Sequence, residues 1–323
     1  MKRFVFLLVC VLVSFCMGIA SGASAPAAGA PPPEFTGITQ WLNSPPLTLA
    51  GLRGKVVLVD FWAYSCINCV RALPHVEHLY QAYKDKGLVV VGVHTPEFDF
   101  EANPGNVQAA IQHLGITYPV AMDDHGGTWN AWHNQVWPAE YLIDQNGRLI
   151  GHHYGEGAYG AMENAIRTLL GMGLLPANAA ATGEIPAAGE TPELHLGSAT
   201  QFGLDPSEAT DSGYGMHRFD VPGQPAANHY ALNGRWDVTK EYARLAGSEG
   251  DIKLRFKAAK VYLVASAAQP VTLQVTVDGK PQPAVTVQGS RLYIVYDGAT
   301  EGEHVLVLHV PQKGVQVYSF TFG

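Results

Sequence analysis

The sequence has little charge, and little of that charge is basic. Asp, Glu, Lys and Arg make up 15% of its 323 residues, and 20 basic against 28 acidic residues give a formal net charge of −8. No basic patch is present, so nucleic acid is a poor candidate partner. Long apolar runs are absent after the first 25 residues, which excludes an ordinary multi-span membrane protein for that part of the chain. With 47% hydrophobic residues, the composition is that of a globular protein.

The one long apolar run lies at the start of the chain. Two cations at positions 2 and 3 precede apolar residues 4–20, and small residues follow. A basic start, an apolar core and small residues at the cleavage positions predict a signal peptide over residues 1–25, cleaved after Ala25 or Ala23. We therefore expect export to the periplasm or outer cell surface of a bacterium. The alternative is an uncleaved N-terminal helix that tethers the protein to the membrane.

Cysteine is nearly absent from the rest of the chain. Two of the four cysteines leave with the predicted signal peptide, so only Cys66 and Cys69 remain. A disulfide between cysteines three positions apart closes a very small loop and adds little stability. In an oxidising compartment such a pair indicates redox chemistry. A zinc site would need two further ligands, and because the sequence has no second such pair, no metal is predicted.

Segments rich in Pro, Ala and Gly divide the chain into a tether at 26–33, a domain at 34–171, a linker at 172–190 and a domain at 191–323. The first domain alternates buried strands with helices, which predicts an α/β domain. The second has apolar residues at every other position and no helical pattern, which predicts an all-β sandwich or jelly roll. In the first domain we expect strands at 55–62, 88–93, 118–122, 141–143 and 148–153, and helices at 66–86, 103–114 and 159–170.

The two cysteines lie where a buried strand ends and a helix begins. Cys66-Ile67-Asn68-Cys69 follows the strand at 55–62 almost directly. Unpaired backbone N–H groups and the macrodipole at a helix N-terminus favour an anion, so the Cys66 thiolate is expected to be stabilised. Cys69, one turn further into the helix, is expected to be buried and to keep its proton until it reacts.

Residues around this motif resemble the thioredoxin superfamily. An acid, Asp60, stands six residues before Cys66, Pro74 follows Cys69 by five, and Trp137-Pro138 precedes a strand in the position of the family's cis-proline loop. The chain from 34 to 171 is similar to the exported TlpA-like branch. Closer still to DipZ-like proteins are Phe61-Trp62-Ala63-Tyr64-Ser65-Cys66-Ile67-Asn68-Cys69, Gly92-Val93-His94-Thr95-Pro96-Glu97-Phe98 and the β domain from Thr191 to Gly323, which in those proteins resembles carbohydrate-binding modules.

The resemblance implies a thiol–disulfide oxidoreductase that uses a reversible Cys66–Cys69 disulfide and no cofactor, with reduction as the default direction. Cys66 would attack a substrate disulfide and Cys69 would resolve the mixed disulfide. The implied roles of the other residues are proton transfer to and from Cys69 for Asp60, an active-site carboxylate for Glu97, peptide binding through the backbone for Pro138, and substrate-contacting site walls for Trp62 and Trp137.

Structural explanations compete with several of these assignments. Asp60 could be a strand acid satisfied by a lysine or water, and Glu97 a solvated loop acid. His75 and His78, three apart on a helix, could begin a metal site, but solvated histidines are the expected interpretation. The G-x-G-x-x-G pattern at 155–160 is expected to be a turn into the last helix, because no suitable strand and acid follow it.

Expected partners are disulfide-containing proteins and an electron donor that is either a membrane protein or a small thiol. DipZ-like proteins usually begin with a multi-helix membrane domain, whereas here the predicted signal segment precedes the tether, so the donor stays unassigned. A glycan is a candidate partner of the β domain, since exposed aromatic residues could stack on sugars. The rival function is a cell-envelope adaptor whose thioredoxin fold carries metal or mediates binding.

Overall fold

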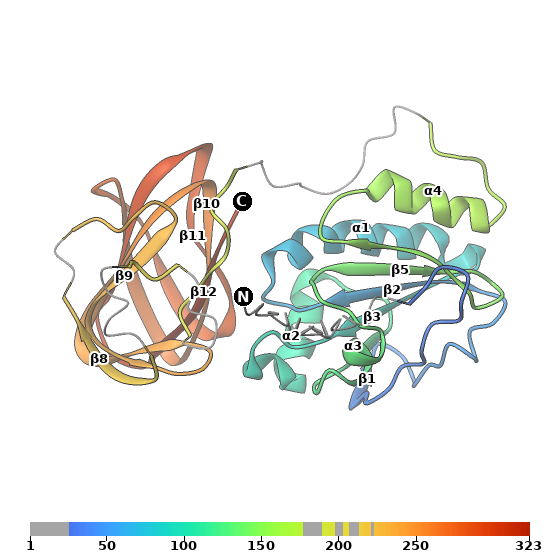
Figure 1. Ribbon diagram of the computed structural model, residues 1–323, viewed down its shortest axis with the longest axis horizontal. Helices are drawn as coiled ribbons and strands as arrows, with labels where there is room; N and C mark the ends of the chain where they lie inside the picture. The colour runs from blue at the N-terminus through green and yellow to red at the C-terminus, as the bar shows by residue number, and fades with distance from the viewer. Residues whose placement is uncertain (1–25, 177–188, 198–202, 207–212, 221–222) are drawn as a thin grey trace, which may run out of the picture.

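The computed structural model describes residues 26–176, 189–197, 203–206, 213–220 and 223–323. These residues form two lobes, an α/β lobe and an all-β lobe (Figure 1). The predicted signal peptide and most of the predicted linker lie outside the described residues. Within the described part, no helix combines the length and hydrophobicity needed to cross a membrane.

A six-stranded mixed sheet forms the centre of the α/β lobe, in the order β1-β4-β3-β2-β5-β6. The three neighbours β2, β3 and β4 are parallel, and the outer pairings are antiparallel. β2 carries the chain toward Cys66, and all seven of its residues are buried because both faces of the sheet are covered. The strands are β1 (Gln40–Leu42), β2 (Val56–Trp62), β3 (Leu88–His94), β4 (Val120–Met122), β5 (Ala139–Ile143) and β6 (Leu149–Tyr154).

Alternate residues of β2 serve two separate cores. Leu58 packs in the cluster that includes residues of α1, α2 and α4, whereas Val59 packs in the cluster around Trp132 on the other face. This alternation follows from the two-residue period of a strand. The helices are α1 (Ile67–Tyr83), α2 (Pro104–Leu114), α3 (Gly127–Ala131) and α4 (Tyr159–Leu169), with 3₁₀ turns η1 at Lys84–Lys86 and η2 at Asp99–Ala102.

Helix ends follow the sequence signals closely. The Asn103 side chain accepts hydrogen bonds from the N–H groups of Gly105 and Asn106 at 2.8 and 3.3 Å, and so caps α2. The same helix ends at Gly115, whose φ of 70° is readily adopted by glycine. The helix predicted to continue to residue 86 becomes a 3₁₀ turn after Tyr83. The short α3 and η2 were not predicted, since neither is long enough to show a periodic pattern.

The second lobe is built from antiparallel strands, as expected for an all-β domain. Two long strands, β10 and β11, pair along most of their length, and the end of β11 also pairs with a second stretch of β10, so the sheet curls around its core. The fully buried Trp236 and Phe320 lie in that core. The strands are β7 (Leu194–His195), β8 (Gly215–Phe219), β9 (His229–Val238), β10 (Ala243–Val277), β11 (Lys280–Val310) and β12 (Val315–Phe322).

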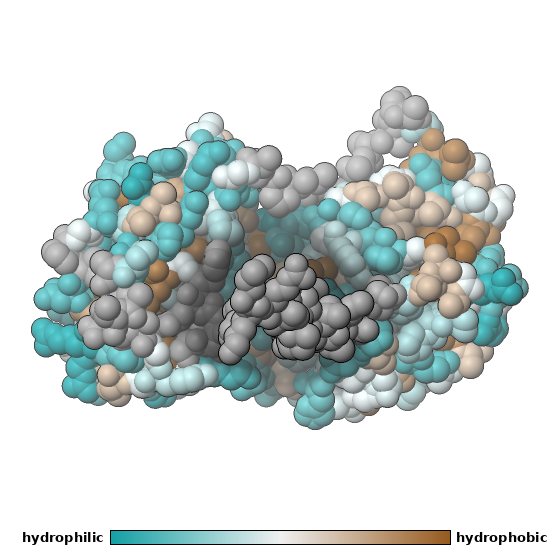
Figure 2. Space-filling view, in the orientation of Figure 1, coloured by the Kyte–Doolittle hydropathy of each residue, from teal (hydrophilic) through white to brown (hydrophobic). Residues whose placement is uncertain are grey.

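The two lobes touch close to the start of α1. The rings of Phe98 and Phe100, in and beside η2, pack on Tyr318 of β12 with centroids 5.1 and 4.8 Å apart. Tyr64, just before the cysteines, donates a hydrogen bond to the carbonyl of Ser290 at 3.0 Å. Through these contacts the β lobe forms part of the surroundings of the cysteine pair. Elsewhere, hydrophilic residues dominate much of the surface visible in Figure 2, and apolar residues gather there in small groups.

Candidate active site

Cys66 caps the N-terminus of α1, and both cysteines are free thiols. The Cys66 sulfur accepts a hydrogen bond from the backbone N–H of Cys69 at 3.5 Å. A sulfur in this position receives an orphan N–H group and the positive end of the helix dipole, both of which favour a thiolate. Cys66 is half-buried and Cys69 is buried. The arrangement therefore offers one accessible sulfur and keeps its partner behind it.

Burial holds Cys69 in its protonated form. The pKa of the Cys69 thiol is raised well above its ordinary value, first by burial and then by its hydrogen bond to the Cys66 sulfur and the charge of that group. The negative charge of Asp60 acts in the same direction. Cys69 can attack only after losing this proton, so the site needs a proton acceptor nearby.

Two buried carboxyl groups lie side by side on neighbouring strands of the sheet, near Cys69. Asp60 of β2 is paired in register with Glu140 of β5, and each has one carboxylate oxygen without a hydrogen-bond partner among the described residues. Burial raises the pKa of Asp60 to about 7, and burial together with Asp60 raises the pKa of Glu140 to about 8. Asp60 is therefore poised to exchange a proton near neutral pH. Glu140 was not predicted, although an acid in an otherwise apolar strand is a usable signal.

A third buried acid, Glu101 of η2, ties the cysteine loop to the loop after β3. One of its oxygens accepts from the N–H and the hydroxyl of Ser65, at 3.0 and 2.8 Å. The other accepts from the N–H groups of Glu97 and Phe98, at 2.7 and 3.2 Å. Burial raises the pKa of Glu101, and these four donors oppose the shift. Glu101 thus fixes the backbone immediately before Cys66, a role that the sequence did not reveal.

His94 is the last residue of β3 and contacts the loop that precedes Cys66. Its ring stacks on Tyr64 with centroids 5.7 Å apart, and its Nε2 accepts the Tyr64 backbone N–H at 3.3 Å. Complete burial lowers the pKa of His94 to about 3, so the ring is neutral at physiological pH and Nε2 is free to accept. His94 is accordingly a structural support rather than a titrating acid or base.

Arg71 connects the cysteine motif to the β lobe. Its guanidinium donates to Glu156 at 2.9 and 2.7 Å, to the side-chain oxygen of Asn68 between the cysteines at 2.7 Å, and to the Phe322 carbonyl at the end of β12 at 3.0 Å. The side chains of Arg71 and Glu156 are only 7% and 5% exposed. The charge of Arg71 is therefore needed to compensate a buried carboxylate as well as to join the two lobes.

Substituting Arg71 with methionine is expected to destabilise the protein by about 3–5 kcal/mol, because Glu156 would be left as a buried charge without its partner. Urea unfolding of the two proteins measures the difference. The matched control is Arg244→Met, which removes an exposed ion pair with Asp237 and is expected to cost about 1 kcal/mol or less. Equal effects of the two substitutions would contradict the assignment.

The peptide bond between Trp137 and Pro138 is cis, and Pro138 is buried immediately before β5. The Trp137 ring packs against Trp129 with centroids 4.2 Å apart and the ring planes tilted by 34°, and both line a cavity of about 330 Å³. Trp137 also packs against the cluster that contains Cys69. Trp62 has no exposed surface. It therefore forms the wall behind the cysteines, and the direct substrate contact expected for it is not available.

Glu97 lies in the loop after β3, beside the cysteine pair. Burial raises the pKa of its carboxyl group well above the ordinary value, and the charges of Glu193 and Cys66 add to this effect. Glu97 is therefore not the fully solvated loop acid of the competing explanation. Its neighbour Glu193 belongs to the β lobe. Glu193 and Thr321 of that lobe, together with Cys66, line a cavity of about 260 Å³. The β lobe thus helps to enclose the reactive sulfur.

The structure shows what two other sequence motifs do. Residues 155–158 of the glycine-rich pattern form the turn from β6 into α4, which begins at Tyr159, as the sequence analysis expected. The expectation of solvated histidines is wrong for His75, which is buried against the Tyr159 ring with centroids 4.6 Å apart. Burial lowers the pKa of His75 to about 4. His78, on the same helix, has a side chain that is 48% exposed.

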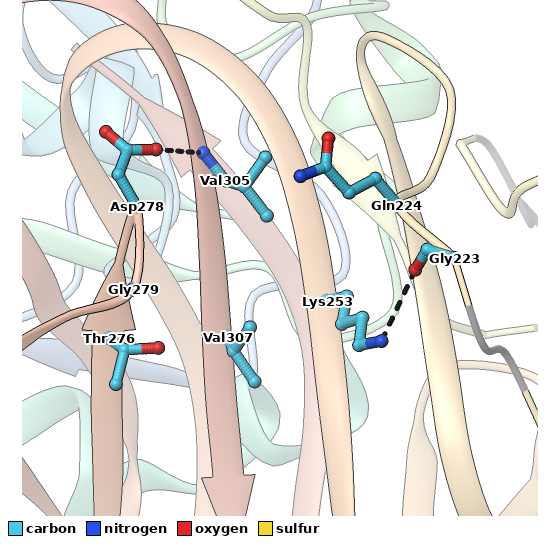
Figure 3. A pocket seen from close by; sticks show the side chains of 8 residues that line it. All are labelled: Gly223, Gln224, Lys253, Thr276, Asp278, Gly279, Val305 and Val307. Carbon is cyan, nitrogen blue, oxygen red and sulfur yellow. Dashed lines mark hydrogen bonds between the residues drawn. The ribbon is translucent and has the colours of Figure 1, made fainter.

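Aromatic residues of the β lobe mostly belong to its core. Tyr230, Trp236 and Tyr293 are at most 6% exposed, whereas Tyr214 is 69% exposed. A cavity of about 660 Å³ lies on this lobe, where Lys253 donates to the carbonyl of Gly223 at 3.3 Å (Figure 3). No aromatic side chain is among the described residues that line it. The stacking surface that a sugar ring would use is therefore not found in this cavity.

Comparison with known proteins agrees with both lobes. Residues 27–170 match the Redoxin family, and residues 191–323 match a family described as the thioredoxin-like C-terminal domain. Thiol-disulfide oxidoreductase YkuV of Bacillus subtilis is 33% identical over 140 residues, which are 43% of this chain and 94% of that protein. A crystal structure of a thioredoxin-like superfamily protein aligns with 45% of this chain and 99% of its own, at 31% identity and a TM-score of 0.41. The chain belongs to the thioredoxin-like thiol–disulfide oxidoreductases.

The similarity to the DipZ proteins extends over both lobes. Protein DipZ of Mycobacterium bovis and that of Mycobacterium tuberculosis are each 44% identical to this chain over 300 residues, which are 90% of the chain. Those 300 residues are 42% of each DipZ protein, so the chain spans about two fifths of the length of these relatives. The resemblance expected from the sequence is confirmed.

Proposed function

We propose that this protein is exported and reduces disulfides in protein substrates through Cys66 and Cys69. The observation that carries the proposal is the pairing of an accessible sulfur at the start of α1 with a buried second thiol and the buried acid Asp60. Export is supported by the sequence of residues 1–25, with the periplasm or outer cell surface as the destination. Direction, substrate class and location are the parts of this function that go beyond family membership.

The first chemical step is attack of the Cys66 thiolate on a substrate disulfide. A bond forms between the Cys66 sulfur and one substrate sulfur, the substrate disulfide breaks, and the other substrate sulfur leaves as a thiolate that takes up a proton. The N–H of Cys69 and the α1 dipole stabilise the attacking thiolate. The reaction thereby produces a mixed disulfide and a free substrate thiol.

The second step needs Cys69 to lose its proton. With a pKa of about 7, Asp60 can take this proton near neutral pH. The Cys69 thiolate then attacks the Cys66 sulfur, breaks the mixed disulfide and releases the substrate in its reduced form. The enzyme is left with a Cys66–Cys69 disulfide, which a small thiol or a membrane electron donor must reduce before the next cycle.

Substrate would approach over a surface that both lobes form. The cavity beside Cys66 is lined by Asn68 of the α/β lobe and by Thr191 and Thr321 of the β lobe. The Pro138 carbonyl already accepts from the Gly155 N–H at 2.8 Å, so an extended peptide would lie instead against half-buried Trp137, which precedes the cis bond and lines the second cavity. A protein substrate would therefore contact the β lobe as well as the redox motif.

The reduction potential tests the direction of the reaction. We expect the Cys66–Cys69 couple to have a potential of roughly −200 mV or lower, in the range of reducing thioredoxin-like proteins and below the value of about −120 mV typical of a strong oxidant. Equilibration of the protein with glutathione buffers, followed by alkylation and mass measurement, gives the value. A potential near −120 mV would replace reduction by oxidation as the function.

A further inference from the structure

Glu97, Glu193 and His195 meet at the seam between the two lobes, and we propose that they form a binding site for a divalent cation of the zinc class. Glu97 follows β3 of the α/β lobe, whereas Glu193 and His195 lie in and beside β7 of the β lobe. One ligand atom from each of the three residues lies within 4.8 Å of the others. The site exists only where the lobes are docked, so it is absent from either lobe alone.

The spacing fits coordination better than direct hydrogen bonding. His195 Nε2 lies 3.7 Å from the nearer oxygen of Glu193, which is longer than a hydrogen bond. Zinc bonds of about 2.0–2.1 Å would place neighbouring tetrahedral ligands roughly 3.3–3.5 Å apart. The three atoms are thus slightly more open than a filled tetrahedral face, and a bound cation would draw them together. A water molecule would complete a three-ligand zinc site of this kind.

The charges around the site also favour a bound cation. Glu97 is half-buried, and no described residue donates a hydrogen bond to its carboxylate. No lysine or arginine in the described part of the chain forms an ion pair with Glu97 or Glu193. Among the described residues, the basic side chain paired with these carboxylates is therefore His195, 3.7 Å from Glu193, and the Ser319 hydroxyl also acts on Glu193.

Mixed carboxylate and imidazole ligands suit zinc better than calcium or magnesium, which prefer oxygen alone. Other groups beside the site are Cys66 and Glu101, which act on Glu97 electrostatically, Ser319, which acts on Glu193, and the Phe98 ring, whose centroid lies 6.3 Å from that of His195. Cys66 is outside the set of three ligand atoms. The proposed site is therefore separate from a zinc site made by the cysteine pair itself.

Zinc titration of the full chain carrying Cys10→Ser, Cys16→Ser, Cys66→Ser and Cys69→Ser tests the proposal, because this variant has no thiol left to bind zinc. Isothermal titration at pH 7.5 is expected to give about one zinc per chain. Adding Glu193→Gln or His195→Ala to this background is expected to weaken binding at least tenfold. The matched control is His309→Ala, which removes another histidine paired with an acid of the β lobe, Asp251 at 2.8 Å, and is expected to leave the affinity unchanged.

Thermal unfolding provides a second readout that does not depend on activity. Zinc is expected to raise the Tm of the cysteine-free chain and to leave that of the His195→Ala variant unchanged, because a ligand stabilises only the state that binds it. Three outcomes would overturn the site: no stoichiometric zinc on the cysteine-free chain, zinc that survives both seam substitutions, or zinc that binds only when the cysteines are present. Disulfide reduction by the wild-type protein in a chelating buffer tests the proposed function separately.

Discussion

Replacing Cys69 with serine is expected to stop the reaction at the mixed disulfide, whereas replacing Cys66 is expected to prevent it from starting. The reason is geometric: Cys66 is the half-buried sulfur at the start of α1, and Cys69 lies buried behind it. Turnover of a disulfide substrate in the presence of a thiol donor should fall by roughly three orders of magnitude or more in Cys66→Ser, the scale expected for loss of a nucleophile. Cys69→Ser should form one stable covalent adduct per chain.

Mass spectrometry under non-reducing conditions distinguishes the two variants. Cys69→Ser mixed with a disulfide-containing protein should gain the mass of one substrate chain, and a reducing agent should release it. In the chain without residues 1–25, Cys66→Ser should gain nothing under the same conditions, because the remaining Cys69 thiol is buried and its pKa is raised. An adduct on Cys66→Ser but not on Cys69→Ser would exchange the two roles.

The redox motif could be predicted from the sequence because its signals are local. A buried strand, a helix start and two cysteines three residues apart fall within one short segment, and the structure places Cys66 at the helix cap. Helix α2 was predicted for the same reason, since Asn103 at its start and Gly115 at its end are adjacent in sequence to the helix they limit. Local backbone rules decide such features with little help from the rest of the fold.

The remaining site residues were missed because distant parts of the chain bring them together. Glu193 approaches Glu97 only after the β lobe docks, and Arg71 meets the Phe322 carbonyl across 251 positions of sequence. Nothing in the letters around Glu193 indicates that contact. Burial was the other property that the sequence predicted wrongly. His75 was expected to be solvated, but the helix face that carries it packs against Tyr159. Which face of a polar-looking helix is covered depends on its partners.

Replacing Asp60 with asparagine is expected to stabilise the fold above pH 7 by up to about 4 kcal/mol, since the pKa of this buried carboxyl group rises from 3.8 in the unfolded chain to about 7 and each unit corresponds to about 1.4 kcal/mol. Because the folded pKa is the higher one, the native state holds more protons than the unfolded state between about pH 4 and pH 7. Wild-type stability therefore falls as pH rises through this window. The gain from the substitution should vanish below about pH 4, which denaturant unfolding at several pH values measures.

The same substitution should slow the second chemical step, because asparagine cannot take the proton from Cys69. Loss of a general base typically costs roughly a hundredfold or more, and release of a preformed mixed disulfide can be followed directly. The control is Asp123→Asn, another buried acid whose two oxygens accept from Thr128, Trp129 and Thr95; there the substitution should destabilise the fold and leave the release step unchanged. A stability gain for Asp60→Asn without slower release would make Asp60 a strained structural acid, and proton transfer would then fall to Glu140 or to water.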